Sequence, residues 1–502
     1  MKVSNQPEPA PRQVVDVLFI NPGSRASLYQ GLGANLSAVE PPILAAHFAG
    51  YVRGKGLTTD IIDAPVFNLG IDDVVAQVDS RYQATLIVIP VYGFQPSAST
   101  QNMTIVGELC RALKAKQITT PILLTGTHPA ALPRLTMEQE AVEFVCDQEG
   151  PQTIYALHAQ LCQEVADYRA VPNLWFRQGG EILSTEAGPL MVDLDSEMPM
   201  PAWDLLPMSD YRAHNWHCFE HINERQPYAS IYTSLGCPYK CSFCCINAPF
   251  GKPAYRMWSP EVVLRQIETL VNEYGIKNIK ISDEMFVLNA RHLLEICDRL
   301  IERGYDLNIW AYARVDTVKD EYLEKLFRAG FRWLALGIES ASKQVRDGVE
   351  KGRFGDVDII DTVRRIQGAG INVIGNYIFG LPDDTEQSMQ QTLALALEAR
   401  CEFANFYSAM AYPGSPLYTQ AIAHGPALPE RWVGYSQHSY DCLPLATQTL
   451  SAAQVLRFRD EAFQRYYSDE GYLALVGEKF GPEVRSHIQE MAAVPLKRKI
   501  YR

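Results

Sequence analysis

The stretch LGCPYKCSFCCI at residues 235–246 contains three cysteines in a CxxxCxxC spacing, at Cys237, Cys241 and Cys244. Three thiolates can bind three of the irons of a cubane 4Fe–4S cluster and leave the fourth iron open, and iron–sulfur clusters prefer soft thiolate ligands. Cys245 follows Cys244 directly, so it cannot easily reach the opposite corner of the same cube. We therefore expect a cluster whose open iron takes part in chemistry.

The motif resembles the cluster motif of the radical S-adenosylmethionine (SAM) superfamily. In that family the open iron binds the amino and carboxylate groups of SAM, and an electron from the cluster cleaves SAM to methionine and a 5′-deoxyadenosyl radical. The resemblance implies that Phe243 lies near the adenine. The alternatives are a chance group of cysteines or a structural zinc site, which needs four ligands in a closed tetrahedron. No second CxxC or HxxxH pair follows at zinc-finger spacing, which disfavours zinc.

Length, composition and charge narrow the class of protein. With 502 residues, 47% of them hydrophobic, the chain is long enough for two to four domains with buried cores. A net charge of −13 without a basic run argues against nucleic acid as a partner, because such binding depends on clustered Lys and Arg. The polar start MKVSNQPEPAPRQ lacks the apolar segment of a secretory signal, and no stretch reaches the roughly 18 apolar residues of a membrane span. The 11 scattered cysteines indicate reduced thiols, so we expect a soluble cytoplasmic protein.

Residues 13–165 read as alternating strands and helices, after a tail at residues 1–12 that we expect to be disordered. Short apolar runs that end at Gly or Pro alternate with helical stretches, which predicts a doubly wound, Rossmann-like parallel sheet. The runs are 14–20, 59–63, 84–90 and 121–125, and a helix is expected at 42–54. Ligands of such sheets bind outside the carboxyl ends of the strands, so the loops to consider are 21–24, 91–96, 126–130 and 147–151.

This order resembles the cobalamin-binding domain that precedes the barrel in one large subclass of the radical SAM superfamily. The matching segments are TGTHPA at 125–130 and CDQEGP at 146–151, where family members carry a Gly-rich turn and a GEGE-like loop. The DxHxxG signature, whose His replaces the lower axial base, is absent, so the resemblance implies base-off cobalt without a strong His ligand. The residues implied for cobalamin binding are Ser24, Tyr92, Gly93, Phe94, Thr125, Gly126, His128, Gln148, Glu149 and Gly150.

Two histidines, and the domain as a whole, leave other interpretations open. His47 lies on or near the apolar face of the 43–53 helix, and we expect it to pack in the core. His128 lies in a predicted ligand loop but could equally be a turn residue. The whole domain could be a flavodoxin-like module that binds no corrin, because Gly-rich loops between strands and helices are individually weak evidence.

The rest of the chain is expected to contain a linker, a barrel and a helical region. The linker spans 166–225 and includes a hairpin across Gly179 and Gly180. Residues 416–502 are mainly helical, and this region either shapes the substrate pocket or caps the barrel without substrate contact. The domain at 226–415 matches the partial (β/α)6 barrel of the radical SAM fold, with the cluster loop at the carboxyl end of the first strand, where barrel sites are built. Its six apolar runs are 231–235, 276–282, 308–315, 333–338, 373–379 and 403–412.

Polar residues end several of the expected barrel strands. The group at 282–284 ends the second strand, where the family presents a carboxylate to the SAM ammonium, and a carboxylate is a suitable acceptor for a cation. Arg314 lies at the end of the third strand, and its forked guanidinium suits the carboxylate of SAM. A structural ion pair of Arg314 with Asp316 or Glu339 is the alternative. The fourth and fifth strands end in the family's GIES-like and GLPDD-like segments. The residues implied for SAM binding, besides Phe243, are Ser282, Asp283, Glu284, Arg314, Glu339 and Asn376.

The resemblance implies a reaction that uses a 4Fe–4S cluster, SAM and cobalamin. One SAM methylates cob(I)alamin, which gives methylcobalamin and S-adenosylhomocysteine. A second SAM gives the 5′-deoxyadenosyl radical, which abstracts hydrogen from an unactivated carbon of a small-molecule intermediate, and the substrate radical takes the methyl group. Cobalamin-dependent cyclisation, ring rearrangement or oxidation is the second interpretation, and a cobalamin- or redox-sensing binding protein is the third.

The partners of this reaction are an external electron donor of the flavodoxin or ferredoxin type and a small-molecule substrate. The sequence shows no obvious catalytic dyad, and hydrogen abstraction needs no protein base, so the catalytic residues are unknown. Candidates for substrate contact are Cys401, which precedes the sixth strand, and His438 and Cys442, which precede the C-terminal helices. Buried free cysteines are also common in ordinary cores.

Overall fold

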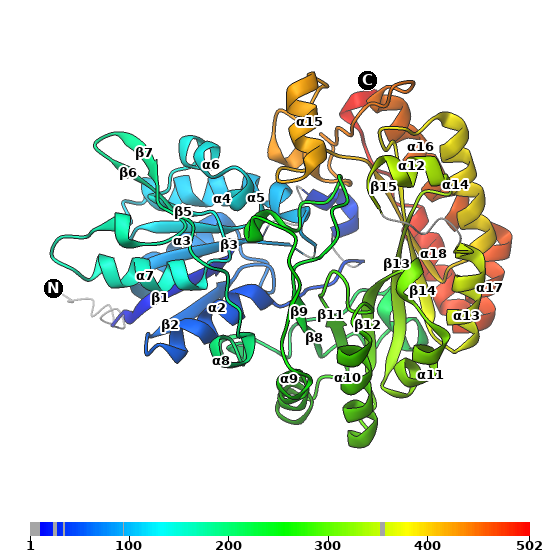
Figure 1. Cartoon of the computed structure of the whole chain (residues 1–502), viewed down its shortest axis with the longest axis horizontal. Coiled ribbons are helices and arrows are strands. Elements are labelled where there is room, and N and C mark those ends of the chain that lie inside the picture. Colours follow the sequence, from blue (N-terminus) through cyan, green and yellow to red (C-terminus); the bar gives the residue numbers. More distant parts are fainter. Residues whose placement is uncertain (1–10, 24–27, 34–35, 94, 352–356, 502) are drawn as a thin grey trace, which may run out of the picture.

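The computed structural model describes residues 11–23, 28–33, 36–93, 95–351 and 357–501. Two α/β domains lie side by side, and the C-terminal helices pack on the second (Figure 1). In the described ranges no helix is both long and apolar enough to cross a membrane. Most of the tail expected at residues 1–12 lies outside the described residues, and the first strand begins at Gln13.

The first domain is built on a seven-stranded sheet with the order β2-β1-β3-β4-β5-β6-β7. Its first five strands run parallel, as predicted, because short apolar runs alternate with helices. The strands are β1 (Gln13–Asn21), β2 (Thr59–Asp63), β3 (Tyr82–Val91), β4 (Ile122–Gly126), β5 (Phe144–Cys146), β6 (Leu174–Gln178) and β7 (Glu181–Ser184).

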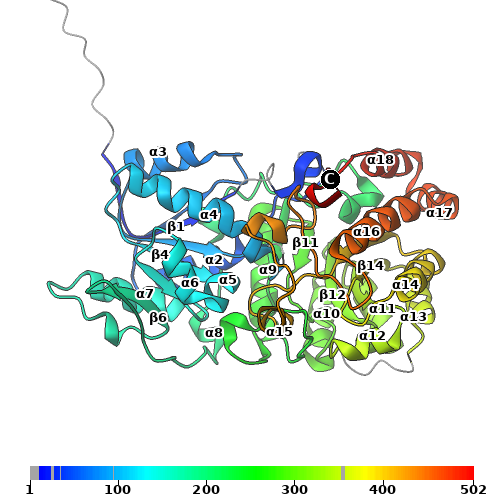
Figure 2. The ribbon, with the colours of Figure 1, turned by 90° about the horizontal axis from the view of Figure 1, so that it is seen from above.

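Helices cover both faces of this sheet (Figure 2). Val17 and Phe19 of β1 face one core, and Leu18 and Ile20 face the other, because successive side chains of a strand point to opposite faces. The first core includes α2 (Ile43–Gly54) and α7 (Pro151–Leu161), and the second includes α3 (Ile71–Arg81) and α4 (Ala98–Ala115). The sheet is therefore doubly wound, and its ligand edge is the one where β1 and β3 end.

The segment 166–225, which we expected to be a linker, contributes two strands to the first sheet. The predicted hairpin forms as β6 and β7, and β6 pairs antiparallel with β5 through Phe144 and Phe176. Pairing satisfies the backbone of β5, which would otherwise be a sheet edge. The hairpin is therefore part of the first domain, and the connection to the barrel begins after it.

The second domain is a six-stranded parallel sheet with the order β15-β14-β13-β12-β11-β8. Five strands lie where the sequence predicts them. The prediction of the first strand at 231–235 is wrong, because the parallel strand ends at Ile231. Residues 234–235 instead form a separate antiparallel ribbon with Arg256 and Met257. The six strands of the sheet are β8 (Tyr228–Ile231), β11 (Asn278–Ile281), β12 (Asn308–Arg314), β13 (Phe331–Glu339), β14 (Asn372–Phe379) and β15 (Phe403–Ser408). The ribbon consists of β9 (Ser234–Leu235) and β10 (Arg256–Met257).

Amphipathic helices cover the outer face of this sheet. The first begins after the N-cap Ser259, whose side chain accepts a hydrogen bond from the amide of Val262 at 3.3 Å. The covering helices are α9 (Pro260–Tyr274), α10 (Ala290–Arg303), α11 (Asp320–Arg328), α13 (Ile359–Gly368) and α14 (Glu386–Ala399). Shorter helices in connections are α5 (Thr127–Ala131), α6 (Pro133–Gln139), α8 (Leu194–Glu197) and α12 (Lys343–Gly348).

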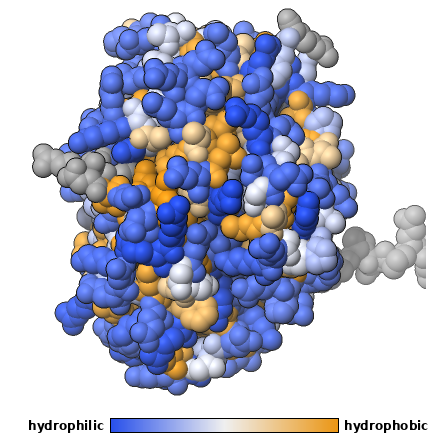
Figure 3. Space-filling model, turned by 90° about the vertical axis from the view of Figure 1, so that its right-hand side faces the viewer, coloured by the Kyte–Doolittle hydropathy of each residue, from blue (hydrophilic) through white to orange (hydrophobic). Residues whose placement is uncertain are grey.

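The C-terminal helices close the open side of the barrel along β15. They are α16 (Ala452–Tyr467), α17 (Glu470–Phe480) and α18 (Pro482–Ala492), whereas the preceding α15 (Pro416–His424) packs in a small core with Ala411 and Leu445. From α16, Arg459 Nε donates to Phe406 O at 2.7 Å and the Tyr467 hydroxyl donates to Ala404 O at 2.6 Å. On the side of the molecule where α17 lies, hydrophilic side chains cover most of the surface and hydrophobic ones gather in a band across it (Figure 3).

Candidate functional site

The cluster loop lies at the carboxyl end of β8, and all three motif cysteines line one cavity of about 240 Å³. Burial raises the pKa of Cys237 to about 11 and raises the pKa of Cys241 as well. Thiolates at these positions therefore need positive charge nearby. Bound iron would supply most of it, and Lys351 and Arg314 add to it at Cys241. Within the described ranges no three His, Cys, Asp or Glu side chains are arranged around a single metal ion. A cubane differs from such a site because each thiolate binds a separate iron.

Glu339 is the most unusual residue of this cavity. It has a φ of +61°, which is uncommon for a residue with a side chain, and it stands at an irregularity in the pairing of β13 with β14. Its Oε1 accepts from Lys351 Nζ, and both side chains are buried. Gly337 makes room for the pair, because a Cβ there would lie 2.7 Å from Lys351 Nζ. Strained backbone of this kind clusters at functional sites.

Three groups among the described residues hold Arg314 at the end of β12. Its guanidinium forms a two-point ion pair with Asp316 at 2.9 and 3.1 Å, donates to Lys351 O and lies 4.0 Å from the ring centroid of Tyr239. The structural ion pair with Asp316 that we considered is therefore present, and the one with Glu339 is not, since Glu339 pairs with Lys351. Arg314 still lines the cavity.

The three polar residues that follow β11 have different surroundings. Glu284 lines the cysteine cavity, and burial raises its pKa to about 7. Ser282 lines a different cavity, against the first domain. Asp283 is fully buried and lines neither, and it accepts hydrogen bonds from Thr233 N at 2.6 Å and Ser234 Oγ at 2.6 Å. Of the predicted trio, only Glu284 faces the cysteines, while Asp283 holds the chain where the cluster loop begins.

Two further predicted residues, Phe243 and Asn376, also line the cysteine cavity. Phe243 lies 6.0 Å from Lys351 Nζ, measured to its ring centroid. The Asn376 side chain donates to Leu336 O at 3.1 Å and accepts from Asn405 at 3.0 Å. The amide of Asn376 is therefore held in one orientation between two neighbouring strands.

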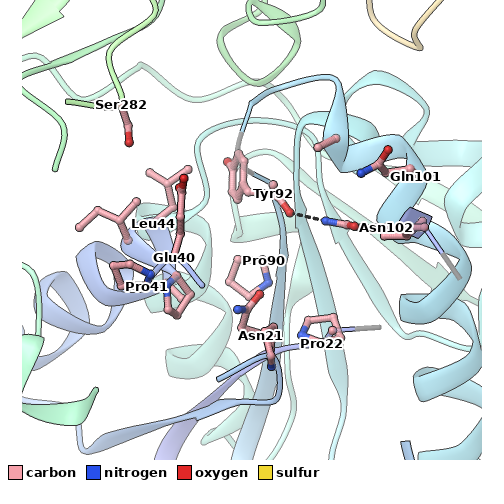
Figure 4. A pocket seen from close by; sticks show the side chains of 18 of the residues that line it. Asn21, Pro22, Glu40, Pro41, Leu44, Pro90, Tyr92, Gln101, Asn102 and Ser282 are labelled. Atoms are coloured by element: carbon pink, nitrogen blue, oxygen red, sulfur yellow. Dashed lines mark hydrogen bonds between the residues drawn. The ribbon is translucent and has the colours of Figure 1, made fainter. Parts of the chain in front are cut away.

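The first domain presents its ligand edge to the barrel. Asn21 ends β1 and Tyr92 follows β3. Asn102 of α4 donates to Tyr92 O at 2.7 Å, and Ser282 lies across the pocket from them (Figure 4). This pocket measures about 120 Å³. A smaller one of about 50 Å³ shares Tyr92 and Gly93 with it and Glu284 with the cysteine cavity. A chain of cavities thus connects the sheet edge to the cluster loop.

Tight turns shape this edge. Gly126 has a φ of +125°, and a Cβ there would lie 2.2 Å from Val91 O. Gly150 has a φ of +108°, and a Cβ there would lie 3.0 Å from the buried Thr125 hydroxyl. A side chain is thereby excluded at these two positions, at the end of β4 and in the turn between β5 and α7. Such close backbone turns fit a large ligand at this edge.

Other residues predicted for cobalamin have different roles. Glu149 forms an ion pair with Arg256 of the barrel at 2.6 Å and accepts from Met191 N at 2.8 Å, so it joins the two domains. Gln148 and Gly150 line only a small pocket of about 10 Å³. His128 is buried in α5, with its ring 4.5 Å from that of Trp432. Ser24 and Phe94 lie outside the described residues.

His47 packs as predicted, and it also lines a cavity between the domains. Its ring stacks on Trp258 at 5.0 Å and borders the 50 Å³ pocket. Burial lowers its pKa to about 3, so the imidazole is neutral at pH 7.

Of the substrate candidates, only His438 lines a cavity. Cys401 is fully buried at the start of β15, and Cys442 is buried in a small core with Met410 and Tyr435. Both cysteines pack in the core, as free thiols often do.

Sequence reasoning missed two buried ion pairs. Lys351 lies in an irregular segment after α12, and no pattern relates it to Glu339. Glu40 of the first domain binds Lys280 of β11 at 3.0 Å, and both are buried. A lysine within a strongly apolar strand run, as Lys280 is, could have indicated a buried partner.

Comparisons with known proteins agree with this architecture. Residues 231–396 match the family model described as radical SAM superfamily, and residues 29–158 match the B12 binding domain. An uncharacterised methyltransferase of Pyrococcus horikoshii is 28% identical over 84% of this chain and 87% of its own length. An anaerobic magnesium-protoporphyrin IX monomethyl ester cyclase of Cereibacter sphaeroides is 26% identical over 80% of this chain, which spans 63% of that relative.

Solved structures show the same fold. The radical SAM methyltransferase TsrM of Kitasatospora setae, with cobalamin and a [4Fe–4S] cluster bound, aligns with a TM-score of 0.68 at 16% identity over 96% of this chain and 99% of its own. The cobalamin-dependent SAM radical enzyme OxsB, with aqua-cobalamin and SAM bound, aligns with a TM-score of 0.69 at 16% identity over 96% of this chain and 72% of its own.

The residues present fit the cofactors of such proteins. Three thiols share one cavity with a carboxylate, Glu284, and a guanidinium, Arg314, which suits a cluster with a zwitterionic ligand. The sheet edge opposite has glycine turns and connected pockets. The chain therefore joins a B12-binding domain to a radical SAM domain, and its cofactors are a 4Fe–4S cluster, SAM and cobalamin.

Proposed function

We propose that this protein is a methyltransferase that transfers a methyl group to an unactivated carbon of a small-molecule substrate. The observation that carries this proposal is the chain of cavities between the domains. Glu284 lines both the cysteine cavity and the pocket that Tyr92 and Gly93 border. A cluster with SAM on one side and a corrin on the other would therefore face one shared space, as methylation of a carbon radical requires.

The side chains of the cysteine cavity are assigned to SAM by their charge. Arg314, which is already paired with Asp316 and lines the cavity, is the guanidinium assigned to the carboxylate. Glu284 and Glu339 are the carboxylates available to the ammonium, and Phe243 and Asn376 are assigned to the adenosine end. When bound, the cluster supplies the electron that cleaves SAM, and cobalamin supplies the methyl group. The protein itself positions these groups and excludes water, for which the half-buried tyrosines Tyr312, Tyr407 and Tyr412 are well suited.

Cyclisation or oxidation without methyl transfer is the second candidate. It is favoured by the 26% identity to the anaerobic magnesium-protoporphyrin IX monomethyl ester cyclase over 80% of this chain. The two candidates differ in their products, because only methyl transfer consumes one SAM as S-adenosylhomocysteine in each turnover.

An anaerobic assay of the reconstituted protein with SAM, hydroxocobalamin and a low-potential reductant tests the proposal. Mass spectrometry follows S-adenosylhomocysteine and 5′-deoxyadenosine. We expect both products, and we expect Cys241→Ala to abolish 5′-deoxyadenosine. The matched control is Cys245→Ala, which removes a neighbouring buried thiol that is not a motif ligand. Formation of 5′-deoxyadenosine alone would favour the cyclase candidate, and the absence of both products would contradict the proposal.

The electron donor and the compartment belong to the same proposal. The cluster needs an external one-electron donor, for which a flavodoxin or ferredoxin is proposed. A cytoplasmic location is supported by the 11 cysteines, all of which are free.

A further inference from the structure

A second cavity, of about 260 Å³, lies inside the barrel and continues the cysteine cavity. It is bordered by the inner sides of β12 to β15, by α16 and by Tyr29 of the first domain. A ligand in this cavity would therefore reach the space in which the cofactors meet. The residues that line both cavities include Tyr312, Asn376, Tyr407, Tyr412 and Gln437.

Aromatic side chains make up about a third of the wall of this barrel cavity. Nine Phe, Tyr and Trp side chains line it. Among them Trp216 lies edge-to-face with Trp310 at 5.1 Å and stacks on Phe403 at 5.8 Å between ring centroids. Rings in these geometries leave faces and edges for another ring, and such contacts add to the free energy gained from burial.

The cationic side chains of the wall are already neutralised. In the part of the chain that the structure describes, the lysine and arginine of this wall are Lys280, paired with Glu40 at 3.0 Å, and Arg459, paired with Asp460 at 2.9 Å. Burial lowers the pKa of His438 to about 3, so its ring is neutral at pH 7. The cavity therefore suits an uncharged group, since an anion would find no free counter-charge.

Three polar atoms of the wall that have no hydrogen-bond partner among the described residues are Trp310 Nε1, His438 Nδ1 and the acceptor Asn405 Oδ1. Asn376 donates to Leu336 O at 3.1 Å and accepts from Asn405 Nδ2 at 3.0 Å, which fixes both amides. Asn405 Oδ1 is left as an acceptor in a half-buried side chain that lines the cavity. A ligand with an N–H or O–H at this point would donate to Asn405 Oδ1 and extend the row of hydrogen-bonded amides.

We propose that the substrate carries an uncharged planar aromatic ring with an N–H or O–H donor, and that this ring binds in the barrel cavity with its donor on Asn405 Oδ1. The inference rests on the proposed function, which it deepens by naming the substrate class. The carbon to be modified then lies at the end of the ring system that faces Tyr312 and Tyr407.

Two matched pairs of probes test this class on the full chain by calorimetric titration. Indole and benzofuran have the same shape but differ in the N–H, and phenol and cyclohexanol share a hydroxyl but differ in planarity. We expect indole to bind about fivefold or more tightly than benzofuran, as one net hydrogen bond implies, and phenol to bind more tightly than cyclohexanol. Equal affinities within either pair would overturn the proposal.

Variants assign the binding to this cavity. Asn405→Leu should remove the preference for indole over benzofuran, whereas Asn223→Leu, at an exposed asparagine, should keep it. Phe463→Ala, on the wall, should weaken phenol binding severalfold, and Phe327→Ala, on an exposed ring, should not. Circular dichroism checks that each variant is folded. An unchanged indole preference in folded Asn405→Leu would overturn the proposal.

The failure of this inference is distinguishable from that of the proposed function. Probe binding needs no turnover, and 5′-deoxyadenosine can be measured without substrate. Binding of probes without SAM cleavage would contradict only the proposed function, and SAM cleavage without probe selectivity would contradict only the aromatic class.

Discussion

The two sides of the space between the domains are built in different ways. The barrel side carries thiols and charged side chains, among them Glu339 and Lys351, each held by a specific partner. On the first-domain side, Glu149 and Glu40 are used to bind the barrel, and the ligand edge is shaped by backbone turns. A small zwitterion is recognised by placed charges, while a large ring system is accommodated by close backbone turns and open pockets.

The largest expected effect concerns the buried ion pair on the barrel side. Lys351→Met leaves Glu339 buried without its partner, and we expect a loss of about 3–5 kcal/mol in the free energy of unfolding. Urea denaturation measures it. Lys325→Met, which breaks an exposed pair with Asp298, should cost at most about 1 kcal/mol.

The double variant Lys351→Met, Glu339→Gln separates the charge from the packing. It should recover much of the stability lost in Lys351→Met, because no buried charge remains. A double variant as unstable as the sum of the two single changes would show that the pair does not couple.

The next effect concerns the backbone side. Gly126→Ala places a Cβ 2.2 Å from Val91 O at a φ of +125°, and we expect a cost on the order of 1–3 kcal/mol together with weaker cobalamin binding. Denaturation and absorbance titration with hydroxocobalamin measure the two quantities. Gly179→Ala in the hairpin turn, where nothing lies within 4 Å of the added Cβ, should leave cobalamin affinity unchanged. Unaltered affinity in a folded Gly126→Ala protein would contradict the placement of cobalamin at this edge.

The last expected effect is a pH dependence on the charged side. Burial raises the pKa of Glu284 to about 7, whereas an unfolded Glu releases its proton at about pH 4.3. The folded state thus holds the proton longer, so the contribution of Glu284 to stability is lost as the pH rises from about 4.5 to 7. Glu284→Gln should flatten this slope in urea titrations of the cluster-free chain, and Glu324→Gln, an exposed change, should not. A full slope in Glu284→Gln would assign the dependence to other groups.

Much of the fold follows from local patterns in the sequence. The alternation of short apolar runs with helices predicts both parallel sheets, and in the first domain each run is also closed by Gly or Pro. The hairpin at Gly179 and Gly180 is predicted as well, but its pairing with β5 is not, because the partner of an edge strand depends on tertiary contacts. The end of the first barrel strand was misplaced for a similar reason, as residues 231–235 are apolar whether or not they join the large sheet.

The site shows the same division. The spacing of the cysteines and the strand-end positions of Arg314 and Glu339 bring them into one cavity, as expected. Which member of the 282–284 group faces that cavity depends on the direction of the chain after the strand, and only Glu284 does. The position of Lys351 opposite Glu339 depends on an irregular segment, whose sequence has no helical or strand periodicity that could predict it. Polar residues at the ends of strands are thus predictable, and partners from loops are not.

The most direct test of the account is electron paramagnetic resonance of the anaerobic holoenzyme, reduced so that the cluster and cobalt(II) are both paramagnetic. Because the cysteine cavity and the sheet-edge pockets connect through Glu284 and Tyr92, the account predicts that the two spins broaden or split each other's signals. Cys244→Ala, which removes the cluster, should leave the cobalt signal unperturbed. Signals of wild-type protein that equal the sum of the two isolated centres would contradict a shared space between cluster and cobalamin.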